Sequence, residues 1–491
     1  MPVFFREENH VLIQFESSTD WDSFYDHCDG YITKRDFQLI HDYLQSSTKT
    51  VVIEKEYVDA DYRDTYYNFF SRKFARYPGK TIRANFFTDK ISPRLLYKLD
   101  RYEDAYIGFI VLRPNRVASI GRTILDPAKI PFVSGHICLA QYPVHILGAE
   151  LVATGFPYMS QDTDVTVCAH AACWMIFRYF SQRYTRYAEK WPYEVTQLTS
   201  NVSTGRLVPS KGLTAHQVTE MFANFGFSPE IYMRHQHPAE LFEKLLYMYV
   251  ESGLPVVAAL SGYAHAITII GHISNYRIEA LTPPASSDAY LEGFITNDDN
   301  FLPYHAIRNN DSLPGSGYWS QYKTSEIDTF IVPLYEKIHL SAEHVLELAE
   351  AILTDSLLGI NVRSACLQYE DTVTRTFLTS SKSFKKMRRE SLLPFGISDV
   401  YCEMPMPKFI WVCEISTPKL YSECTVAGEI LFDATANKHD RLAFLSIHYP
   451  GFLLLNNRDC LTDECKRFTI HEVNSDEIIP YSCYVNNLQE A

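Results

Sequence analysis

Long apolar runs are missing from this sequence of 491 residues, and so is a recognisable secretory signal. No stretch approaches the ~20 consecutive apolar residues that a membrane-spanning helix needs. The opening MPVFFREENHVLIQFE carries acids where a signal peptide has its apolar segment. We therefore expect a protein that does not associate with a membrane.

Closely spaced cysteine pairs are also absent. The 11 cysteines include no CxxC pair, so the spacing of a zinc ribbon does not occur. Scattered free thiols are typical of proteins in a reducing compartment. We expect a cytoplasmic location and no bound metal.

Basic residues are outnumbered by acidic ones. The chain has 45 Lys and Arg against 59 Asp and Glu, which gives a formal charge of −14. Broad binding to nucleic acid needs a basic face that can neutralise phosphates, so we expect no nucleic-acid partner. Aromatic residues reach 14%, and because they serve peptide-binding surfaces as well as cores, they favour a protein or peptide substrate.

The length exceeds what one hydrophobic core usually serves, so we expect several domains of α+β class. Residues 1–145 alternate strand patterns (10–15, 50–58, 106–114) with helical ones (35–45, 59–74) and carry no evident chemistry. Residues 146–335 place helices first and strands later, at 255–260, 265–273, 276–281 and 293–296. Residues 336–491 begin with a helix, continue through a basic stretch at 380–391 that we expect to be a solvated loop or helix, and end in strands.

Residues 161–180, QDTDVTVCAHAACWMIFRYF, organise the middle region. Cys168 stands where a polar, turn-prone segment gives way to the pattern of a buried helix. The positive end of a helix dipole lowers the pKa of a thiol and favours a nucleophilic thiolate. Gln161, seven residues upstream, can donate to the oxyanion that forms after attack. Cys173 is the alternative nucleophile, but it falls more than a turn inside the helix and farther from Gln161.

His265 is the predicted general base. It opens a strand directly after the turn-like SGY, from where its ring can reach a facing helix end and take the thiol proton. His272 lies an odd number of positions along the same strand and therefore points to the opposite face. His170 is two residues from Cys168 on the helix, and such residues do not face each other.

Three neighbouring residues can orient the histidine. Asn297, Asp298 and Asp299 follow a strand and are all chemically able to fix the tautomer of an imidazole. Continued strand alternation would place Asp298 on one face and the other two on the opposite face. An ordinary turn over residues 297–300 is the alternative interpretation.

These residues resemble those of papain-like cysteine peptidases, most closely the type that cuts bacteriocin leader peptides. The resemblance covers about residues 150–310 and rests on the helix entry, on GLPVVAALSGYAHAITIIGHI (253–273) and on FITNDDN (294–300). The matching positions in the helix entry are Gln161, Cys168, Ala171, Ala172, Met175 and Tyr179. Two departures are Ala169, where the family usually has Gly, and a longer spacing from His to Asp, with residues 282–290 as its expected cause.

The resemblance implies a papain-like catalytic domain at 146–335, with Asp298 as the orienting residue and Gln161 at the oxyanion hole. It implies a cysteine-dependent hydrolase that cleaves a peptide or isopeptide bond through an acyl-enzyme, without a metal or organic cofactor. An acyltransferase with the same triad is one alternative. A catalytically idle papain-like interaction module is the other.

Overall fold

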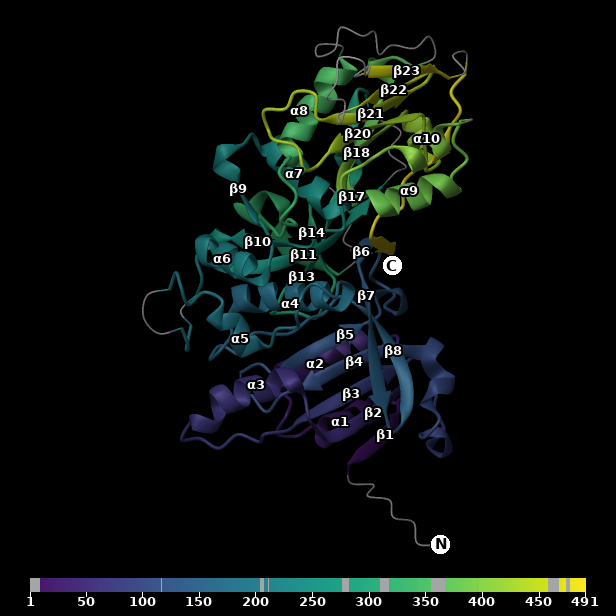
Figure 1. The fold of residues 1–491 in the computed structure, drawn as a ribbon. Coiled ribbons are helices and arrows are strands. Elements are labelled where there is room, and N and C mark those ends of the chain that lie inside the picture. Colours follow the sequence, from purple (N-terminus) through teal and green to yellow (C-terminus); the bar gives the residue numbers. More distant parts are fainter. Residues whose placement is uncertain are drawn as a thin grey trace.

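The computed structural model describes residues 9–115, 117–203, 207–210, 212–275, 282–309, 318–354, 367–394, 396–457, 468–473 and 477–491. Three sheets with their helices follow one another along the long axis of the molecule (Figure 1). The N-terminal region lies at the bottom of that view, the middle region at its centre and the C-terminal region at the top. One cluster of buried apolar residues runs through all three, from Ile13 to Leu488.

The N-terminal region is a five-stranded antiparallel sheet in the order β1-β2-β3-β4-β5. Its helices begin where the sequence offers caps: the side chains of Thr33 and Asp59 accept from backbone N–H groups of α2 and α3. The elements are β1 (His10–Gln14), α1 (Ser18–His27), α2 (Lys34–Leu44), β2 (Thr50–Tyr57), α3 (Ala60–Asn68), β3 (Thr81–Phe87), β4 (Tyr106–Leu112) and β5 (Ile120–Leu125).

The helix expected over residues 59–74 is shorter than its pattern indicates. α3 ends at Asn68, and a 3₁₀ turn, Phe70–Arg72, follows it. The helix stops because Phe69 has φ of −136° and ψ of −62°, outside the helical region, and its N–H donates the last helical bond, to the Thr65 carbonyl. Aromatic side chains also lose rotamer freedom in a helix, so the run after Asn68 does not extend it.

Short strands connect the N-terminal region to the middle one. β7 (Ala140–Ile146) and β8 (Ala149–Gly155) form a hairpin, and the boundary expected at residue 145 falls inside it. β6 (His136–Cys138) pairs with β11 of the middle sheet on one side and with β25 (Leu488–Glu490) on the other. The last strand of the chain therefore returns to the middle of the molecule, as the C label in Figure 1 shows.

The middle region is a mostly antiparallel sheet in the order β15-β14-β13-β11-β10-β16-β9, with α4 packed on β11. A capping box begins α6: Thr214 Oγ1 accepts from the Gln217 N–H, and Gly226 ends the helix with a left-handed backbone. The helices are α4 (Cys168–Arg183), α5 (Pro192–Gln197), α6 (Ala215–Phe225) and α7 (Ala239–Glu251). The strands are β9 (Glu230–Met233), β10 (Val256–Leu260), β11 (His265–Ser274), β13 (Leu291–Asn297), β14 (His305–Arg308), β15 (Trp319–Lys323) and β16 (Thr329–Val332).

The C-terminal region is a seven-stranded sheet in the order β12-β17-β18-β20-β21-β22-β23. Its first strand comes from residues 282–290, the segment between His265 and Asp298 that we expected to lengthen their spacing, and pairs in parallel with β17. The strand expected at 276–281 lies outside the described residues. The strands are β12 (Ala285–Ser286), β17 (Val373–Ser380), β18 (Phe409–Ser416), β20 (Gly428–Asp433), β21 (Phe444–Tyr449), β22 (Phe452–Asn456) and β23 (Phe468–Glu472). β19 (Thr425–Val426) and β24 (Tyr481–Ser482) form a separate pair.

The helices described in this region are α8 (Ala342–Leu353), α9 (Ser381–Glu390), α10 (Ile397–Glu403) and α11 (Pro418–Ser422). The basic stretch at 380–391 is α9, capped by the Ser380 hydroxyl. The expectation that it is solvated is wrong at Arg388, which is fully buried. Arg388 is accommodated because Glu414 and Glu429 accept from its guanidinium at 2.7 and 2.6 Å.

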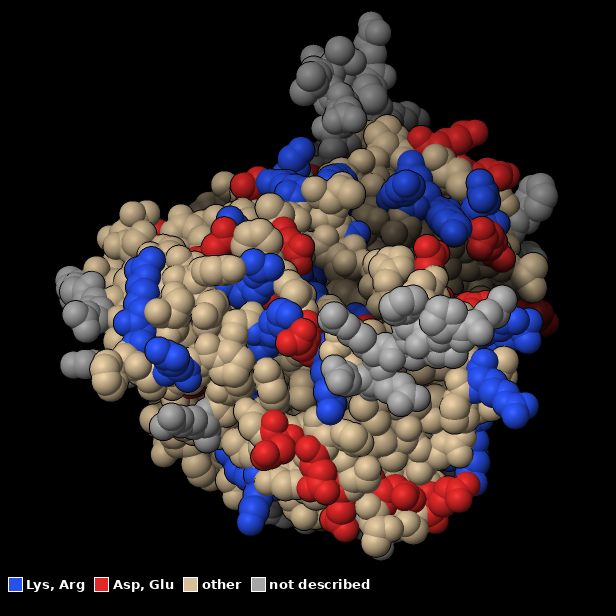
Figure 2. Space-filling model, turned by 90° about the horizontal axis from the view of Figure 1, so that it is seen from below, with Lys and Arg blue, Asp and Glu red and all other residues tan. Residues whose placement is uncertain are grey.

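Separate sheets with helices beside them confirm the expected mixed α and β content, at the level of class. None of the helices in the described ranges is long and apolar enough to cross a membrane. On the face shown in Figure 2, Lys and Arg side chains stand in separate groups with tan and red surface between them. This face therefore offers no continuous basic field for a phosphate backbone.

Candidate active site

The loop before α4 is built around one buried carboxylate. Asp162 Oδ1 accepts from the backbone N–H groups of Asp164, Val165 and Thr166 at 3.1, 2.7 and 2.8 Å. These bonds hold Thr163 in a left-handed conformation with φ of 62°, which a non-glycine residue adopts only where its surroundings fix it. The loop delivers Cys168, half-buried, as the first residue of α4.

His170 helps to begin the same helix. Its Nδ1 accepts from the Val167 N–H at 3.4 Å, across the first turn. Burial lowers the pKa of His170 to about 4, so the ring stays neutral near pH 7 and keeps the lone pair that this bond needs. His170 therefore orders the helix start, in agreement with the expectation that it does not face Cys168.

His265 contacts both of its expected partners. It lies at the first position of β11, where its side chain is 8% exposed, and its Nε2 stands 2.9 Å from Asp298 Oδ1. An interaction with the Cys168 side chain is among the causes that raise the pKa of His265. Because Nε2 faces the carboxylate, Nδ1 is the ring nitrogen that we expect to face the thiol.

The surroundings of His265 favour the imidazolium. Burial alone lowers its pKa, but the hydrogen bonds to Asp298 and Cys168 and the charges of Asp298 and Asp299 outweigh burial and raise the pKa to about 11. An imidazolium beside a thiol is the charge arrangement that stabilises a thiolate.

Two carboxylates face this histidine rather than one. Asp299 Oδ1 lies 3.8 Å from His265 Nε2. The expectation that Asp299 faces away from Asp298 is wrong, because β13 ends at Asn297 and strand alternation does not continue past it. The residues after Asn297 form a turn, in which the Phe301 N–H donates to the Asp298 carbonyl at 3.0 Å.

Asp299 has unusual surroundings for an acid. Its side chain is 1% exposed, and neither carboxylate oxygen has a hydrogen-bond partner of good geometry among the described residues. Burial and the neighbouring Asp298 charge raise the pKa of Asp299 to about 7, against the opposing charge of His265. Its protonation state therefore changes near neutral pH, directly beside the histidine.

Sequence reasoning did not assign a role to Asn300. Its Nδ2 lies 3.4 Å from His265 Nε2, and its backbone N–H donates to Asp298 Oδ1 at 3.0 Å. Asn300 thus fixes the position of the carboxylate that orients the ring. The run NDDN offered the signal, because a turn of Asx residues after a strand brings several polar side chains to one place.

The alternative residues lie elsewhere. Asn297 donates to the Pro157 carbonyl at 3.2 Å and accepts from the Tyr304 N–H at 3.0 Å, so its amide holds neighbouring loops together. Cys173 is fully buried inside α4, and burial raises the pKa of its thiol well above the usual range. His272 faces away from His265, as expected, and its Nε2 lies 2.5 Å from Glu251 Oε2.

Gln161 is half-buried and lines a small cavity together with Asp299 and Asn300. The cavity measures ≈ 90 Å³, and its other wall comes from the N-terminal region, at Arg35 and Leu39 of α2. The amide side chain thus stands on the same side of the molecule as the turn that carries the carboxylates. Its role at an oxyanion hole stays a prediction.

The N-terminal region clamps the turn that carries Asp298. The Tyr43 hydroxyl donates to the Pro303 carbonyl at 2.7 Å, and Arg35 Nη2 donates to the Asn300 carbonyl at 3.1 Å. Tyr158, which belongs to the middle region, adds a third bond: its hydroxyl donates to the Asp299 carbonyl at 3.3 Å. These bonds end on backbone oxygens of the turn and leave the carboxylates of Asp298 and Asp299 directed at His265.

The same residues could hold a cation. Within the described part of the chain, His265, Asp298 and Asp299 are the one set of at least three His, Cys, Asp or Glu residues whose ligand atoms all lie within 4.8 Å of one another. One nitrogen and two carboxylates are ligands that Zn²⁺ accepts. In a thiol mechanism these residues orient and protonate an imidazole, whereas in a metal mechanism they bind a cation. Loss of activity on addition of a chelator would distinguish the second from the first.

Comparisons of the chain with protein-family models, with curated proteins and with solved structures gave no match. The case for a function therefore rests on the residues and their geometry.

Proposed function

We propose that this chain is a cysteine-dependent hydrolase with a papain-like catalytic unit, which cleaves a peptide or isopeptide bond. The hydrogen bond of His265 with Asp298 carries the proposal, together with the interaction with the Cys168 side chain that raises the pKa of the same imidazole. Such a chain of nucleophile, base and orienting carboxylate is the arrangement that covalent catalysis of acyl transfer requires.

In the first half-reaction the Cys168 thiolate attacks the scissile carbonyl carbon, and the electron pair of the C=O bond moves to oxygen. The oxyanion is stabilised by the Cys168 backbone N–H, at the positive end of α4, and by the Gln161 amide. The imidazolium of His265 then gives its proton to the leaving amine as the C–N bond breaks. A thioester on Cys168 and a neutral imidazole remain.

In the second half-reaction His265 takes a proton from water, whose oxygen attacks the thioester carbonyl. The C–S bond breaks, the acid leaves and the thiolate and imidazolium pair is restored. Asp298 holds the ring orientation through both steps and stabilises the imidazolium. Asn300 keeps Asp298 in place and is a positioning residue.

Incubation of the full chain with a library of peptides derived from a proteome, followed by mass spectrometry of new termini, tests this function. We expect cleavage by the wild type, none above background with Cys168→Ala, and a loss of about 10²–10⁴-fold in rate with His265→Ala. A chelator should leave the rate unchanged. Cleavage that persists in Cys168→Ala, or that the chelator abolishes, would contradict a thiol mechanism, and addition of amines to peptides without hydrolysis would favour the acyltransferase.

A further inference from the structure

A second pocket lies at the far end of the helix that carries Cys168. It measures ≈ 410 Å³ and is lined by Arg183, the last residue of α4, by the start of α9 and by the end of β17. Along α4 this end is roughly 22 Å from Cys168, at the usual rise per residue. The volume falls in the range of pockets that hold small molecules, ~300–1,000 Å³.

The lining of this pocket is strongly basic in a protein of formal charge −14. Arg186 pairs with Glu336, the one acidic residue among those that line it. The other basic side chains of the lining form no ion pair with any described residue; they are Arg183, Lys337, Lys382 and Lys408. The three lysines are exposed and therefore solvated, and Arg183 also donates to the Leu139 carbonyl at 2.9 Å. Phosphate is an anion that several such groups can bind together.

The first turn of α9 adds to the positive field. Ser380, Ser381, Lys382 and Ser383 all line the pocket, and the ten-residue helix places the positive end of its dipole there. Helix N-termini bind phosphate groups. Here the Ser381 and Ser383 N–H groups already donate to the Lys408 carbonyl and to the Ser380 hydroxyl, so the helix dipole and the exposed Lys382 side chain supply the attraction.

Aromatic rings form the apolar part of the same pocket. Tyr335 and Phe409 stack with their centroids 4.7 Å apart and 4° between the planes. Tyr184 and Tyr187 line the pocket beside them. Because the two rings stack on each other, a flat ligand ring would lie against an outer face of the pair, beside Lys408, whose Nζ is 5.3 Å from the Phe409 centroid. Inorganic phosphate alone gains nothing from these faces.

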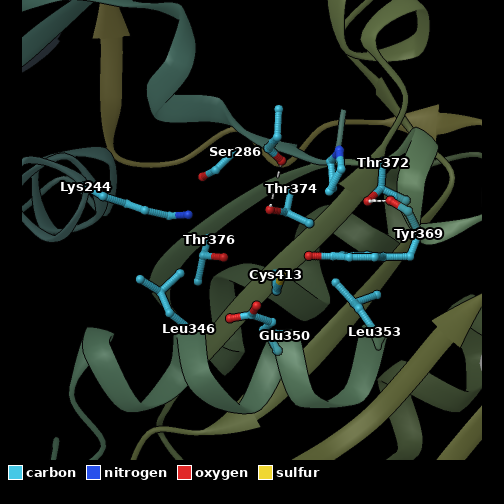
Figure 3. Close-up of a pocket in the computed structure, with 13 residues that line it drawn as sticks. Lys244, Ser286, Leu346, Glu350, Leu353, Tyr369, Thr372, Thr374, Thr376 and Cys413 are labelled. Carbon is cyan, nitrogen blue, oxygen red and sulfur yellow. Dashed lines mark hydrogen bonds between the residues drawn. The ribbon is translucent and has the colours of Figure 1, made fainter. Parts of the chain in front are cut away.

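A comparison along β17 shows that this chemistry is local. The pocket in Figure 3 lies at the opposite end of that strand, at Thr372, Thr374 and Thr376. Its charged residues are one lysine, Lys244, and one glutamate, Glu350, and the labelled side chains around them are mostly hydroxyls. Contact between the middle and C-terminal regions therefore does not by itself produce a basic, aromatic lining.

We propose that the pocket between α4 and α9 binds a nucleotide, with its phosphates at the start of α9 and at Lys382 and Lys408, and its base against the rings of Tyr335 and Phe409. This site is separate from the triad and does not depend on the proposed hydrolase activity. It would let a soluble anionic ligand bridge the C-terminal region and the end of the nucleophile helix.

Titration calorimetry on the full chain at 0.15 M salt, with ATP, AMP and pyrophosphate as the ligands, tests the proposal. We expect one ATP per chain and binding of pyrophosphate that is at least about tenfold weaker, because it lacks the base. Lys382→Glu and Lys408→Glu should each weaken ATP binding about tenfold or more. Lys386→Glu, on the same helix but outside the pocket, should change it less than about twofold, since most of its field is screened at that distance. Cys168→Ala should bind ATP like the wild type.

Failure of ATP and AMP to bind at concentrations up to about 1 mM would overturn the proposal. So would equal binding of pyrophosphate and ATP, equal effects of Lys382→Glu and Lys386→Glu, or binding of an acidic peptide in place of any nucleotide. The substituted side chains, Lys382, Lys386, Lys408 and Cys168, are exposed or half-buried. Each variant should therefore melt at the same temperature as the wild type, and this measurement checks that every variant compared is folded.

Discussion

The two outer regions of the molecule differ in which part of the middle one they contact. The N-terminal region reaches α4 through a buried ion pair between Asp61 and Arg178, and it also reaches the turn that carries Asp298. The N-terminal region meets the turn that carries Asp298 through single hydrogen bonds to backbone carbonyls, such as that of Tyr43 with Pro303. The C-terminal region meets α7 through buried charges: Arg375 donates to Glu251 at 2.8 Å and to Glu414 at 2.8 Å. Arg388 and Glu429 continue the same network into α9 and β20.

The two kinds of contact should affect different properties: the hydrogen bonds the position of the turn, and the buried ion pairs the free energy of unfolding. A neutral bond to a backbone carbonyl is worth about 1 kcal/mol, yet it fixes one atom in space without adding charge beside the triad. Breaking a buried ion pair leaves an uncompensated charge and costs about 3–5 kcal/mol. We therefore expect the hydrogen bonds to the turn that carries Asp298 to set its position, and the buried charges around Arg375 to stabilise the contact between the middle and C-terminal regions.

Arg375→Met should have the largest effect on folding. It leaves Glu251 and Glu414 buried beside each other without their shared cation, so we expect a loss of about 3–5 kcal/mol in the free energy of unfolding. Denaturant titration followed by circular dichroism measures this loss. Lys386→Met on the exposed face of α9 is the control and should cost less than about 0.5 kcal/mol. Slower reaction of Cys168 in the folded Arg375→Met protein would contradict the separation of roles.

Asp299→Asn should change the pH dependence of the site. The pKa of Asp299 is raised to about 7 from 3.8, so the folded state disfavours its charge and loses stability as the pH rises from about 4 to 7. The variant should lack this loss and be more stable than the wild type above pH 7, as denaturant titration at pH 5 and pH 8 would show.

Ionised Asp299 also supports the imidazolium of His265. The alkylation rate of Cys168 should therefore rise through pH 7 in the wild type and show no such step in Asp299→Asn; an unchanged step would assign it to another group.

Tyr43→Phe removes one hydrogen bond that holds the segment next to Asp298 and Asp299 in place. The hydroxyl donates to the Pro303 carbonyl at 2.7 Å in a buried position, so we expect a loss of about 1 kcal/mol in the free energy of unfolding together with a several-fold slower reaction of Cys168. Tyr142→Phe is the matched control, since that buried hydroxyl has no hydrogen-bond partner among the described residues. Tyr142→Phe should leave the free energy of unfolding and the reaction rate of Cys168 unchanged. Equal effects of the two substitutions would show that the bond from Tyr43 to Pro303 has no role in the site.

Arg35→Ala should have the smallest effect on stability. The side chain is exposed and its bond to the Asn300 carbonyl is 3.1 Å long, so we expect less than about 0.5 kcal/mol. Because Arg35 also lines the cavity of Gln161 and Asp299, the KM for peptide substrates should change more than kcat. Lys34→Ala, its exposed neighbour outside that cavity, serves as control and should change neither.

Local features of the fold could be predicted from the sequence. The capping box of Thr214 and Gln217, the stop at Gly226, the helix that begins at Cys168 and the strand that begins at His265 all follow from patterns a few residues long. The contact between His265 and Asp298 follows from placing a helix start, a strand start and a strand end together. That placement is predicted by the resemblance to a family, because no local sequence pattern pairs residues 33 positions apart.

Features that depend on long-range partners could not be predicted. Arg375 meets Glu251, 124 positions away in sequence, and no local pattern pairs them. Arg388 stands in a run of basic residues that usually marks a solvated surface, and only the fold brings Glu414 and Glu429 to it. Asp299 joined the site because β13 ends one residue before Asp298, and strand ends are the least certain feature of a sequence pattern.

The most direct measurement of the central claim is the alkylation rate of each cysteine by iodoacetamide at pH 7, mapped by mass spectrometry in the wild type and in His265→Ala. Cys402 and Cys424 are exposed and serve as internal references. If the thiol of Cys168 is activated by His265 and Asp298, it should react faster than both references although it is half-buried, and lose that advantage in His265→Ala while the references do not change. Reaction of Cys168 no faster than Cys402, or equally fast in the variant, would contradict the triad.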